Sequence, residues 1–250
     1  KLVNDGKAPF HEEGLSQILE KIGGKELECT SDFSRPINET DITYILTNTP
    51  SQPDGSFSNK HILSVLESLS FELKKSSKEY HLFVISSTVM PGSISNHFVP
   101  LIEKITGRKL NEGFGVGYCP DFVAIGEVLK GFTNPELVVI GQSDSIVGEL
   151  INEIHHNITE NKPSMHRMTI ASAEIAKVSL NAYITMKITF ANTLANICSK
   201  TPLSNVDHIT NAIGQDKRIS PYYFKGGMSY GGTCFPRDTF AFNHLNKSLG

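Results

Sequence analysis

The first two thirds of the chain alternate between two patterns of hydrophobic residues. Short apolar runs, rich in β-branched and aromatic residues, predict buried strands at residues 42–46, 82–85 and 136–140. Between and after them, apolar residues recur every three or four positions, which predicts helices at residues 59–76, 93–106 and 144–157. Strands that alternate with helices in this way are typical of an α/β domain with a parallel sheet.

The pattern changes in the last third of the chain. Residues 172–200 contain neither glycine nor proline and carry no strand pattern, which predicts one long helix. A second helix is predicted at residues 206–213, and a glycine-rich loop follows at residues 222–234. We therefore predict two domains, residues 1–163 with the sheet and residues 164–250 with the helices.

Composition and charge exclude several classes of partner. The net charge of −3 and the scattered basic residues give no reason to expect a nucleic acid. No apolar run approaches the roughly 20 residues that span a bilayer, so no membrane partner is expected. The 4 cysteines lie far apart, which favours a reducing compartment and hence the cytoplasm.

The histidines give no sign of a metal site. None of the 9 histidines has a partner at the spacing of zinc ligands. His155 and His156 are adjacent and point to different faces of a helix, and both are expected at the surface.

A cysteine follows two glycines near the end of the chain. Gly231 and Gly232 permit a sharp turn and the close approach of a ligand to Cys234. If a helix begins there, Asp238 lies one turn later and close to the thiol. Such a cysteine taken alone is more often a buried core residue, so its assignment depends on the rest of the chain.

Three polar residues share one face of the predicted long helix. Glu174, Lys177 and Asn181 are spaced by three and four positions among mostly apolar neighbours. Buried polar side chains need specific partners. Two interpretations stay open, a surface ion pair between Glu174 and Lys177 or a polar stripe that faces a substrate cleft.

Hydroxyl-bearing residues followed by proline end two of the predicted strands. In open α/β sheets, ligands bind beyond the carboxyl ends of the strands. The residues after the first two strands are therefore candidates for cofactor binding: Thr47, Asn48, Thr49, Pro50, Ser87, Thr88 and Val89.

Five segments, in order, resemble motifs of the UDP-glucose/GDP-mannose dehydrogenase family. The stretch around Cys234 is similar to the motif GYGGxCxPKD, and residues 173–181 are similar to AELxKxxxN. Residues 87–92 resemble STVxPG, residues 119–123 resemble NPEFL, and residues 216–219 resemble DxRI. The order and spacing agree over nearly the whole chain, and five motifs together are far more specific than one.

This resemblance implies an incomplete Rossmann-like domain followed by a helical central and dimerisation domain. It implies NAD as cofactor and a nucleotide sugar, UDP-glucose or a related UDP-sugar, as substrate of polysaccharide biosynthesis. The C6 alcohol would be oxidised to the uronic acid in two hydride transfers, through a thioester on Cys234. It also implies a homodimer formed through the long helix.

The resemblance further implies roles for single residues. Lys177 would stabilise the thiolate and the oxyanion, Asn181 would be a second donor, and Asp238 would hold Lys177 or a water. Thr88 would position the water or contact the cofactor, and Asp121 would act on the hydrolytic water. Substrate contacts would come from Phe122, Val123, Ala124, Ile125, Lys177, Asn181, Arg218, Lys225 and Gly231.

Three positions depart from the family pattern and indicate a divergent subfamily. Asp121 replaces the glutamate of NPEFL, Ile125 replaces a second glutamate found in many members, and Arg237 replaces the more usual lysine. No GxGxxG motif occurs in the 250 residues, and the family's third domain would follow Gly250. We therefore expect part of a longer enzyme, which alone binds NAD poorly because it lacks the phosphate-binding loop.

Two other hypotheses stay open. The chain is either a truncated, non-catalytic module that dimerises, or a related hydroxy-acid or sugar-acid dehydrogenase in which Cys234 is structural. The first predicts a dimer that binds no nucleotide sugar. The second predicts one NADH per substrate, where the nucleotide-sugar dehydrogenase yields two.

Overall fold

The computed structural model describes residues 1–123 and 126–250, which form two compact units. The first unit comprises Lys1–Thr49 and Asn59–Glu174. The second comprises Pro50–Ser58 and Ile175–Gly250.

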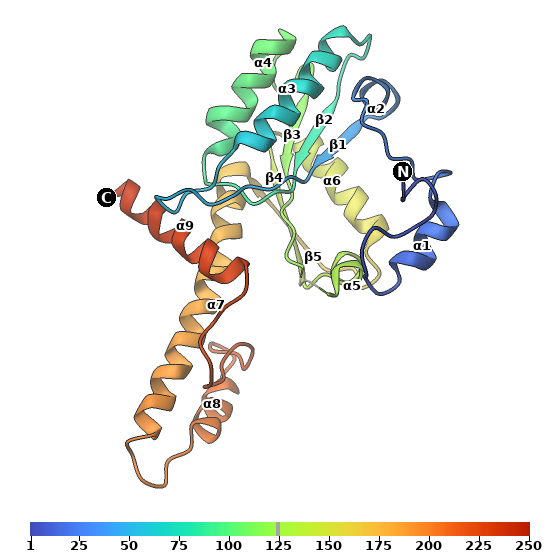
Figure 1. Ribbon diagram of the computed structural model, residues 1–250. Helices are drawn as coiled ribbons and strands as arrows, with labels where there is room; N and C mark the ends of the chain where they lie inside the picture. Colours follow the sequence, from blue (N-terminus) through green and yellow to red (C-terminus); the bar gives the residue numbers. More distant parts are fainter. Residues whose placement is uncertain (124–125) are drawn as a thin grey trace. The chain divides into compact units, whose positions relative to one another are not determined.

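A five-stranded sheet organises the first unit (Figure 1). The strands lie in the order in which they occur in the chain, and neighbours are parallel except for the third and fourth, which are antiparallel. The expected α/β fold is thus present, with a sheet that is mostly parallel. The strands are β1 (Ile42–Ile45), β2 (Leu82–Ile85), β3 (Gly115–Tyr118), β4 (Leu137–Gln142) and β5 (Ser164–Thr169).

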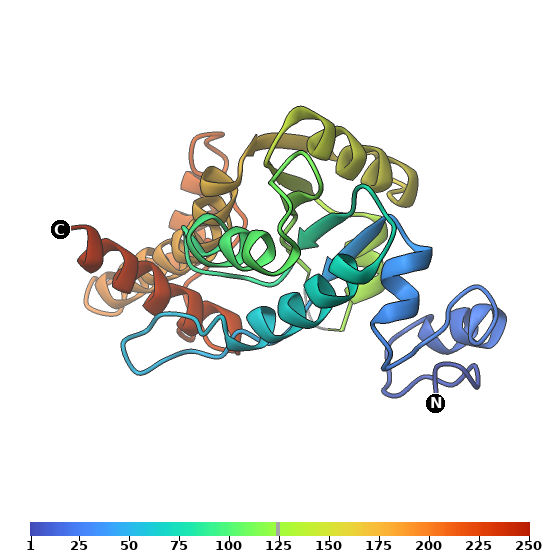
Figure 2. The same cartoon turned by 90° about the horizontal axis from the view of Figure 1, so that it is seen from above.

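Helices cover both faces of this sheet (Figure 2). α3 and α4 pack together on one face, and α6 packs against β3 and β4 on the other. Asp144 is the N-cap of α6, because its carboxylate accepts a hydrogen bond from the Val147 amide at 2.8 Å. The helices of this unit are α1 (Leu15–Ile22), α2 (Ser34–Glu39), α3 (Lys60–Lys75), the π-helical turn η1 (Ile94–Phe98), α4 (Val99–Thr106), α5 (Val128–Thr133) and α6 (Ser145–Ile158).

The strands β2 and β4 are buried on both faces of the sheet, which explains their uninterrupted apolar runs. In β2, Phe83 and Ile85 belong to the core cluster under α3 and α4, while Leu82 and Val84 belong to the cluster under α6. Side chains of a strand alternate between its faces, so a strand covered on both sides must be apolar throughout.

The hydrophobic pattern of the sequence did not predict two of the strands, β3 and β5, for different physical reasons. β3 contains Gly115 and Gly117, where a Cβ would lie 2.7 Å from Cγ2 of Val147 or would clash with Ile151, so glycine is needed for α6 to approach the sheet. β5 is an edge strand with several exposed polar residues and lacks an apolar run. Because β5 pairs with β4, the sheet continues beyond residue 163.

The second unit contains three helices and the separate segment Pro50–Ser58. The helices are α7 (Ile170–Cys198), whose first turn to Glu174 belongs to the first unit, α8 (Val206–Gly214) and α9 (Cys234–Leu249). The predicted uninterrupted helix is confirmed by α7, and α8 lies where it was predicted. The loop at Pro50–Ser58 lies beside α9, and its Asp54 carbonyl is 2.9 Å from Nδ1 of His244 (Figure 2). Across the described residues, no helix combines the length and the apolar character that would let it cross a membrane.

Candidate active site

Cys234 is the first residue of α9, as its position after two glycines suggested. Gly232 adopts φ 78°, a left-handed conformation that glycine takes without strain, and the chain then turns into the helix. The thiol is exposed, and Oγ1 of Thr233 lies 3.6 Å from its sulfur. The start of a helix carries partial positive charge, and the thiol lies at this end of α9.

Asp238, one turn after Cys234, joins α9 to α7. Its carboxylate is 4% exposed, and Oδ2 accepts a hydrogen bond of 2.7 Å from Nδ2 of Asn181. One turn further along α7, Thr185 lies 3.1 Å from Thr239 of α9, hydroxyl to hydroxyl. Lys177 occupies the preceding turn of α7 and is 8% exposed. Asn181 and Asp238 thus join α7 to α9, with Lys177 one turn before Asn181 and Cys234 one turn before Asp238.

Glu174 has a structural role that neither interpretation of the polar stripe foresaw. Its carboxylate is fully buried and accepts hydrogen bonds from the amides of Gly92 at 2.7 Å and Ile94 at 3.1 Å. Burial raises its pKa, and these two hydrogen bonds act against that rise. Glu174 thus ties the start of α7 to the turn that begins η1.

The predicted cofactor residues meet at the carboxyl ends of β1 and β2. Oγ of Ser87 accepts a hydrogen bond from the Thr47 amide at 2.7 Å and lies 2.8 Å from the Thr47 carbonyl. The hydroxyl of Thr49 donates to the carbonyl of Thr88 at 2.7 Å. Asn48 is exposed, and the side chain of Val89 lies in the core, so Val89 offers a ligand only its backbone.

This strand edge suits a polar cofactor. Within the described chain, Oγ1 of Thr47 is a buried hydroxyl oxygen without a hydrogen-bond partner. A buried hydroxyl left in this state is costly unless a ligand or water satisfies it. The ribose and phosphate groups of a dinucleotide offer such partners.

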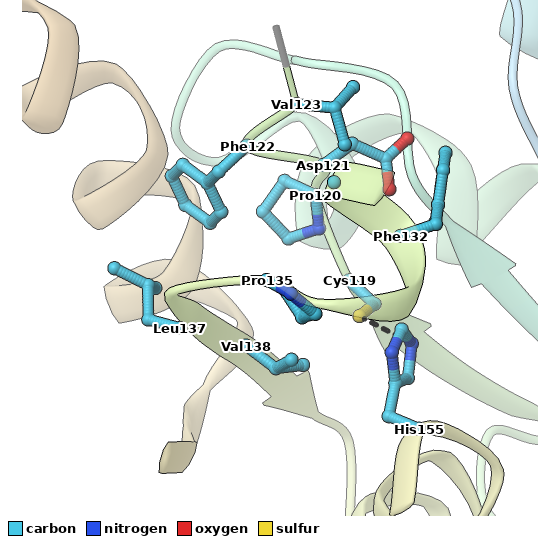
Figure 3. Close-up of a pocket in the computed structure, with 11 residues that line it drawn as sticks. Cys119, Pro120, Asp121, Phe122, Val123, Phe132, Pro135, Leu137, Val138 and His155 are labelled. Carbon is cyan, nitrogen blue, oxygen red and sulfur yellow. Dashed lines mark hydrogen bonds between the residues drawn. The ribbon is translucent and has the colours of Figure 1, made fainter. Parts of the chain in front are cut away.

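The loop after β3 is anchored by a buried thiol–imidazole pair (Figure 3). Sγ of Cys119 lies 3.1 Å from Nε2 of His155, which comes from α6. Burial raises the pKa of Cys119 to about 12 and lowers that of His155. Both groups are therefore neutral near pH 7. His155 is buried, so the expectation that it lies at the surface is wrong. His156 is exposed as expected.

Asp121 follows this pair, and the negative charge of its carboxylate adds to the rise of the Cys119 pKa that burial causes (Figure 3). Phe122 packs against the larger core cluster, and Val123 packs against α5, where a Cβ on Gly131 would meet Cγ1 of Val123 at 2.8 Å. The two further substrate residues expected here, Ala124 and Ile125, lie outside the described residues.

Three further predicted substrate residues, Arg218, Lys225 and Gly231, lie in the loop between α8 and α9. Arg218 is exposed and binds the Asp216 carboxylate through Nε at 3.0 Å and Nη2 at 2.6 Å, which lowers the pKa of Asp216. Lys225 and Gly231 are also exposed. All three are accessible to a ligand.

Two residues of α7 that the sequence did not single out hold this loop in place. Nζ of Lys187 donates to the carbonyls of Ile219, Ser220 and Tyr222 at 2.7 to 3.1 Å. Oδ1 of Asn192 accepts from the amide of Gly227 at 2.9 Å. Their partners lie more than 30 residues away in the chain, and they belong to none of the recognised motifs.

The fold and the site define a class of protein. A mostly parallel sheet with hydroxyl groups at its carboxyl edge is a Rossmann-like nucleotide-binding domain. The helical unit adds an exposed thiol at the start of a helix, beside buried polar groups. The sheet domain thus defines a Rossmann-like nucleotide-binding protein that also contains a helical unit.

Comparison with known proteins identifies the family. Residues 1–159 match the NAD binding domain of the UDP-glucose/GDP-mannose dehydrogenase family, and residues 171–250 match its central domain. The chain belongs to this family, and NAD is the cofactor of the domain that it contains.

Curated relatives support this assignment along the whole chain. GDP-mannose 6-dehydrogenase of Pseudomonas aeruginosa is 33% identical over 253 residues, which cover 99% of this chain and 56% of that protein. UDP-glucose 6-dehydrogenase of Haloferax volcanii is also 33% identical, over 99% of this chain and 57% of that protein. The chain thus spans a little more than half the length of these relatives.

Solved structures show the same fold. A UDP-glucose dehydrogenase from Pyrobaculum islandicum superposes with a TM-score of 0.87 at 27% identity, over 99% of this chain and 56% of that one. A ternary complex of GDP-mannose dehydrogenase from Pseudomonas aeruginosa superposes with a TM-score of 0.78 at 32% identity, with the same coverage.

Proposed function

We propose that these residues belong to an NAD-dependent dehydrogenase that oxidises the C6 alcohol of a nucleotide sugar to the uronic acid. The observation that carries this proposal is the exposed thiol of Cys234 at the start of α9, one turn before Asp238, which accepts a hydrogen bond from Asn181. The names of the relatives, GDP-mannose 6-dehydrogenase and UDP-glucose 6-dehydrogenase, support the substrate class. In this proposal, residues 1–163 bind the cofactor and residues 164–250 carry the nucleophile.

Cys234 lets the oxidation proceed through a covalent intermediate. Its thiolate adds to the C6 aldehyde that the first oxidation leaves, and the new carbon–sulfur bond forms a thiohemiacetal. Loss of a hydride and a proton from that adduct leaves a thioester. Water then cleaves the carbon–sulfur bond, which releases the carboxylate and regenerates the thiol. NAD, when bound, supplies the acceptor for both hydrides.

The neighbouring polar groups stabilise the charges of these steps. Lys177 and the free N–H of the Asn181 amide donate to the oxyanion of the adduct, while Asp238 fixes the orientation of Asn181. Thr88 and Asp121 position the hydrolytic water. The cofactor contacts the edge formed by Thr47, Asn48, Thr49, Pro50, Ser87, Thr88 and the Val89 backbone, and the substrate contacts Phe122, Val123, Ala124, Ile125, Arg218, Lys225 and Gly231.

For the nucleotide we propose a UDP-sugar, with GDP-mannose as the second candidate. Two relatives with these different substrates in their names are equally similar to the chain, at 33% identity each. The ratio of kcat/KM for UDP-glucose and GDP-mannose decides between them.

Replacement of the proposed nucleophile tests the reaction. In the full-length protein that contains this chain, Cys234→Ser is expected to lower production of NADH and uronic acid by about 10³-fold or more, because a serine hydroxyl is a far weaker nucleophile. Cys198→Ser is the matched control, since Cys198 is a half-buried cysteine at the end of α7, and it should retain activity. Near-normal turnover of Cys234→Ser would remove the covalent mechanism.

The stoichiometry tests the competing hypotheses. The proposal requires two NADH per sugar oxidised, whereas a simple hydroxy-acid or sugar-acid dehydrogenase yields one. A dimer without any affinity for a UDP-sugar or GDP-sugar would favour the non-catalytic module.

We further propose a homodimer formed through α7. Tyr183, Met186, Phe190 and Ile197 are each more than half exposed and lie three, four and seven positions apart, which forms an apolar stripe along the helix. A stripe of large apolar side chains exposed to water is typical of an interaction surface.

We also propose that the protein works in a reducing compartment, the cytoplasm. All 4 cysteines are free thiols, and two of them, Cys29 and Cys234, are exposed. The proposed nucleophile would be lost by oxidation in a compartment that forms disulfides.

A further inference from the structure

The helix that carries Cys234 is held from two sides within the second unit. One side of α9 faces α7 through Asp238 and Thr239. The other contacts the loop at Pro50–Ser58 through Arg237, Phe240 and His244, which are spaced by three and four positions and therefore share a helix face. Apart from Pro50, which is one of the proposed cofactor contacts, the residues of this 50–58 loop have no role in the proposed reaction.

The 50–58 loop is braced by its own hydrogen bonds. Ser51 and Phe57 form an antiparallel bridge, and the Gln52 amide donates to the carbonyl of Ser56 at 2.8 Å. The Asp54 carboxylate accepts from both the amide and the hydroxyl of Ser56, at 2.9 and 2.7 Å. A loop with this many internal bonds keeps one shape and can hold a neighbouring side chain in a defined position.

The loop approaches α9 closely at two points. At Gly55, with φ 92°, a Cβ would lie 3.1 Å from the carbonyl oxygen of Phe240, so glycine allows the tight approach. At Phe57, the guanidinium of Arg237 stacks over the ring, with its Cζ 4.2 Å from the ring centroid. The Phe57 side chain is 3% exposed, so the ring is fixed by its surroundings.

Arg237 links this ring to the site. Its Nε lies 3.8 Å from Oδ1 of Asp238, while Oδ2 of the same carboxylate accepts the hydrogen bond from Asn181. One oxygen of Asp238 thus forms an ion pair with the guanidinium that stacks on Phe57, and the other accepts a hydrogen bond from α7. The attraction of the guanidinium favours the orientation of the carboxylate in which Oδ1 faces Arg237 and Oδ2 accepts from Asn181.

We propose that the 50–58 loop is a positioning element of the active site, in which Phe57 holds Arg237 and Arg237 orients Asp238, and through it Asn181. This inference rests on the proposed function, because the orientation of Asn181 matters only where its amide donates to the oxyanion of the adduct. Phe57 and Arg237 are positioning residues and need not touch substrate.

Removal of the ring face is the first test. In the full-length protein, Phe57→Leu keeps an apolar side chain but removes the π-face, and it is expected to lower kcat about tenfold, with KM for the nucleotide sugar within about twofold of wild type. Phe57→Tyr restores the ring and should restore kcat. Phe71→Leu removes an exposed ring from α3 and is the matched control.

A double-mutant cycle tests the order of the contacts. If Phe57 acts only through Arg237, the combined Phe57→Leu and Arg237→Met variant should be no slower than Arg237→Met alone. Independent, multiplicative losses would overturn the proposal. So would a kcat of Phe57→Leu equal to that of wild type, or a Phe57→Tyr variant as slow as Phe57→Leu.

A measurement without turnover separates this inference from the proposed reaction. The side-chain amide resonances of Asn181 in a ¹⁵N-correlated NMR spectrum should shift in Phe57→Leu and stay in place in Phe71→Leu. Unmoved Asn181 resonances would overturn the positioning role even if Cys234→Ser proves the reaction. Shifted resonances in a protein that produces no NADH would leave the positioning intact and remove only the proposed function.

Discussion

At the scale of single residues, the site depends on polar groups that are buried and paired. Asp238 is almost fully enclosed, yet its carboxylate contacts both Asn181 and Arg237. A buried charge is tolerated only when such partners compensate for the lost water. The pairing therefore sets the orientation of the groups that flank Cys234.

Asp238→Asn should separate charge from shape at this position. The substitution keeps the size of the side chain but removes the negative charge that orients Asn181, and we expect kcat to fall about 100-fold with little change in KM. Steady-state NADH production by the full-length protein measures the effect. Asp207→Asn, an exposed aspartate in the first turn of α8, should leave kcat unchanged. Equal activity of Asp238→Asn and Asp207→Asn would show that the charge has no role.

His81 makes the first unit sensitive to acid. The imidazole is fully buried beside Thr43, with 2.8 Å between Nε2 and Oγ1, and burial lowers its pKa to about 4. The unfolded chain, with a pKa near 6.5, binds a proton that the folded protein does not bind, so stability is lost as pH falls below about 6.5.

We expect the free energy of unfolding to fall by about 2 kcal/mol between pH 7 and pH 5 because of His81 alone. Urea unfolding at the two pH values measures it. In His81→Gln the difference between the two pH values should shrink by about that amount, whereas the exposed His61→Gln should behave as wild type. An unchanged difference in His81→Gln would assign the acid sensitivity to other groups.

At the scale of elements, ties between distant segments matter as much as the elements themselves. Glu174 at the start of α7 binds two backbone amides at the turn before and within η1. These amides lie at a helix start, where the backbone N–H groups have no hydrogen-bond partner within the helix itself. The Glu174 carboxylate thus caps a helix start that lies 80 residues earlier in the sequence.

Glu174→Gln should weaken this tie. The amide group retains one accepting oxygen but places an N–H₂ against the second backbone donor, and we expect the free energy of unfolding to fall by about 1 to 3 kcal/mol. Glu153→Gln, an exposed glutamate on α6, should change it by less than about 0.5 kcal/mol. Equal stability of the two variants would show that the second hydrogen bond contributes nothing.

At the scale of the whole molecule, the open question is assembly. The apolar stripe on α7 extends from Tyr183 to Ile197, and one of its members, Phe190, stacks on Phe224 with ring centroids 6.1 Å apart. A second copy of the chain would cover these side chains in the proposed homodimer.

Sedimentation of the purified chain should show a particle of twice 27.5 kDa. Met186→Glu places a charge in the stripe and should shift the equilibrium toward the monomer, because a buried unpaired carboxylate is costly. Ile146→Glu, at a similarly exposed apolar position on α6, is the matched control and should remain dimeric. A wild-type chain that is monomeric at all concentrations would remove the proposal.

Local patterns in the sequence predicted the elements whose character is set by their own residues. The periodic helices α3, α6, α7 and α8 and the buried strands β1, β2 and β4 agree with the structure within a few residues at their ends. The sequence also predicted the family, since the motifs around Cys234 and Asn181 are short and contiguous. It predicted that Thr47 and Ser87 meet at one edge of the sheet, because neighbouring parallel strands end at the same edge.

Only the tertiary structure decided the features that depend on partners far away in the chain. β3 contains glycines because α6 packs closely against it. His155 is buried against Cys119 of the loop after β3. Glu174 acts as a cap because Gly92 and Ile94 present their amides to it. The contact of Phe57 with Arg237 joins residues on a loop and a helix that no sequence pattern relates. Hydrophobic periodicity records how a segment meets its immediate environment, whereas the pairing of individual polar groups is set by the packing of whole elements, and that packing exists only in the folded chain.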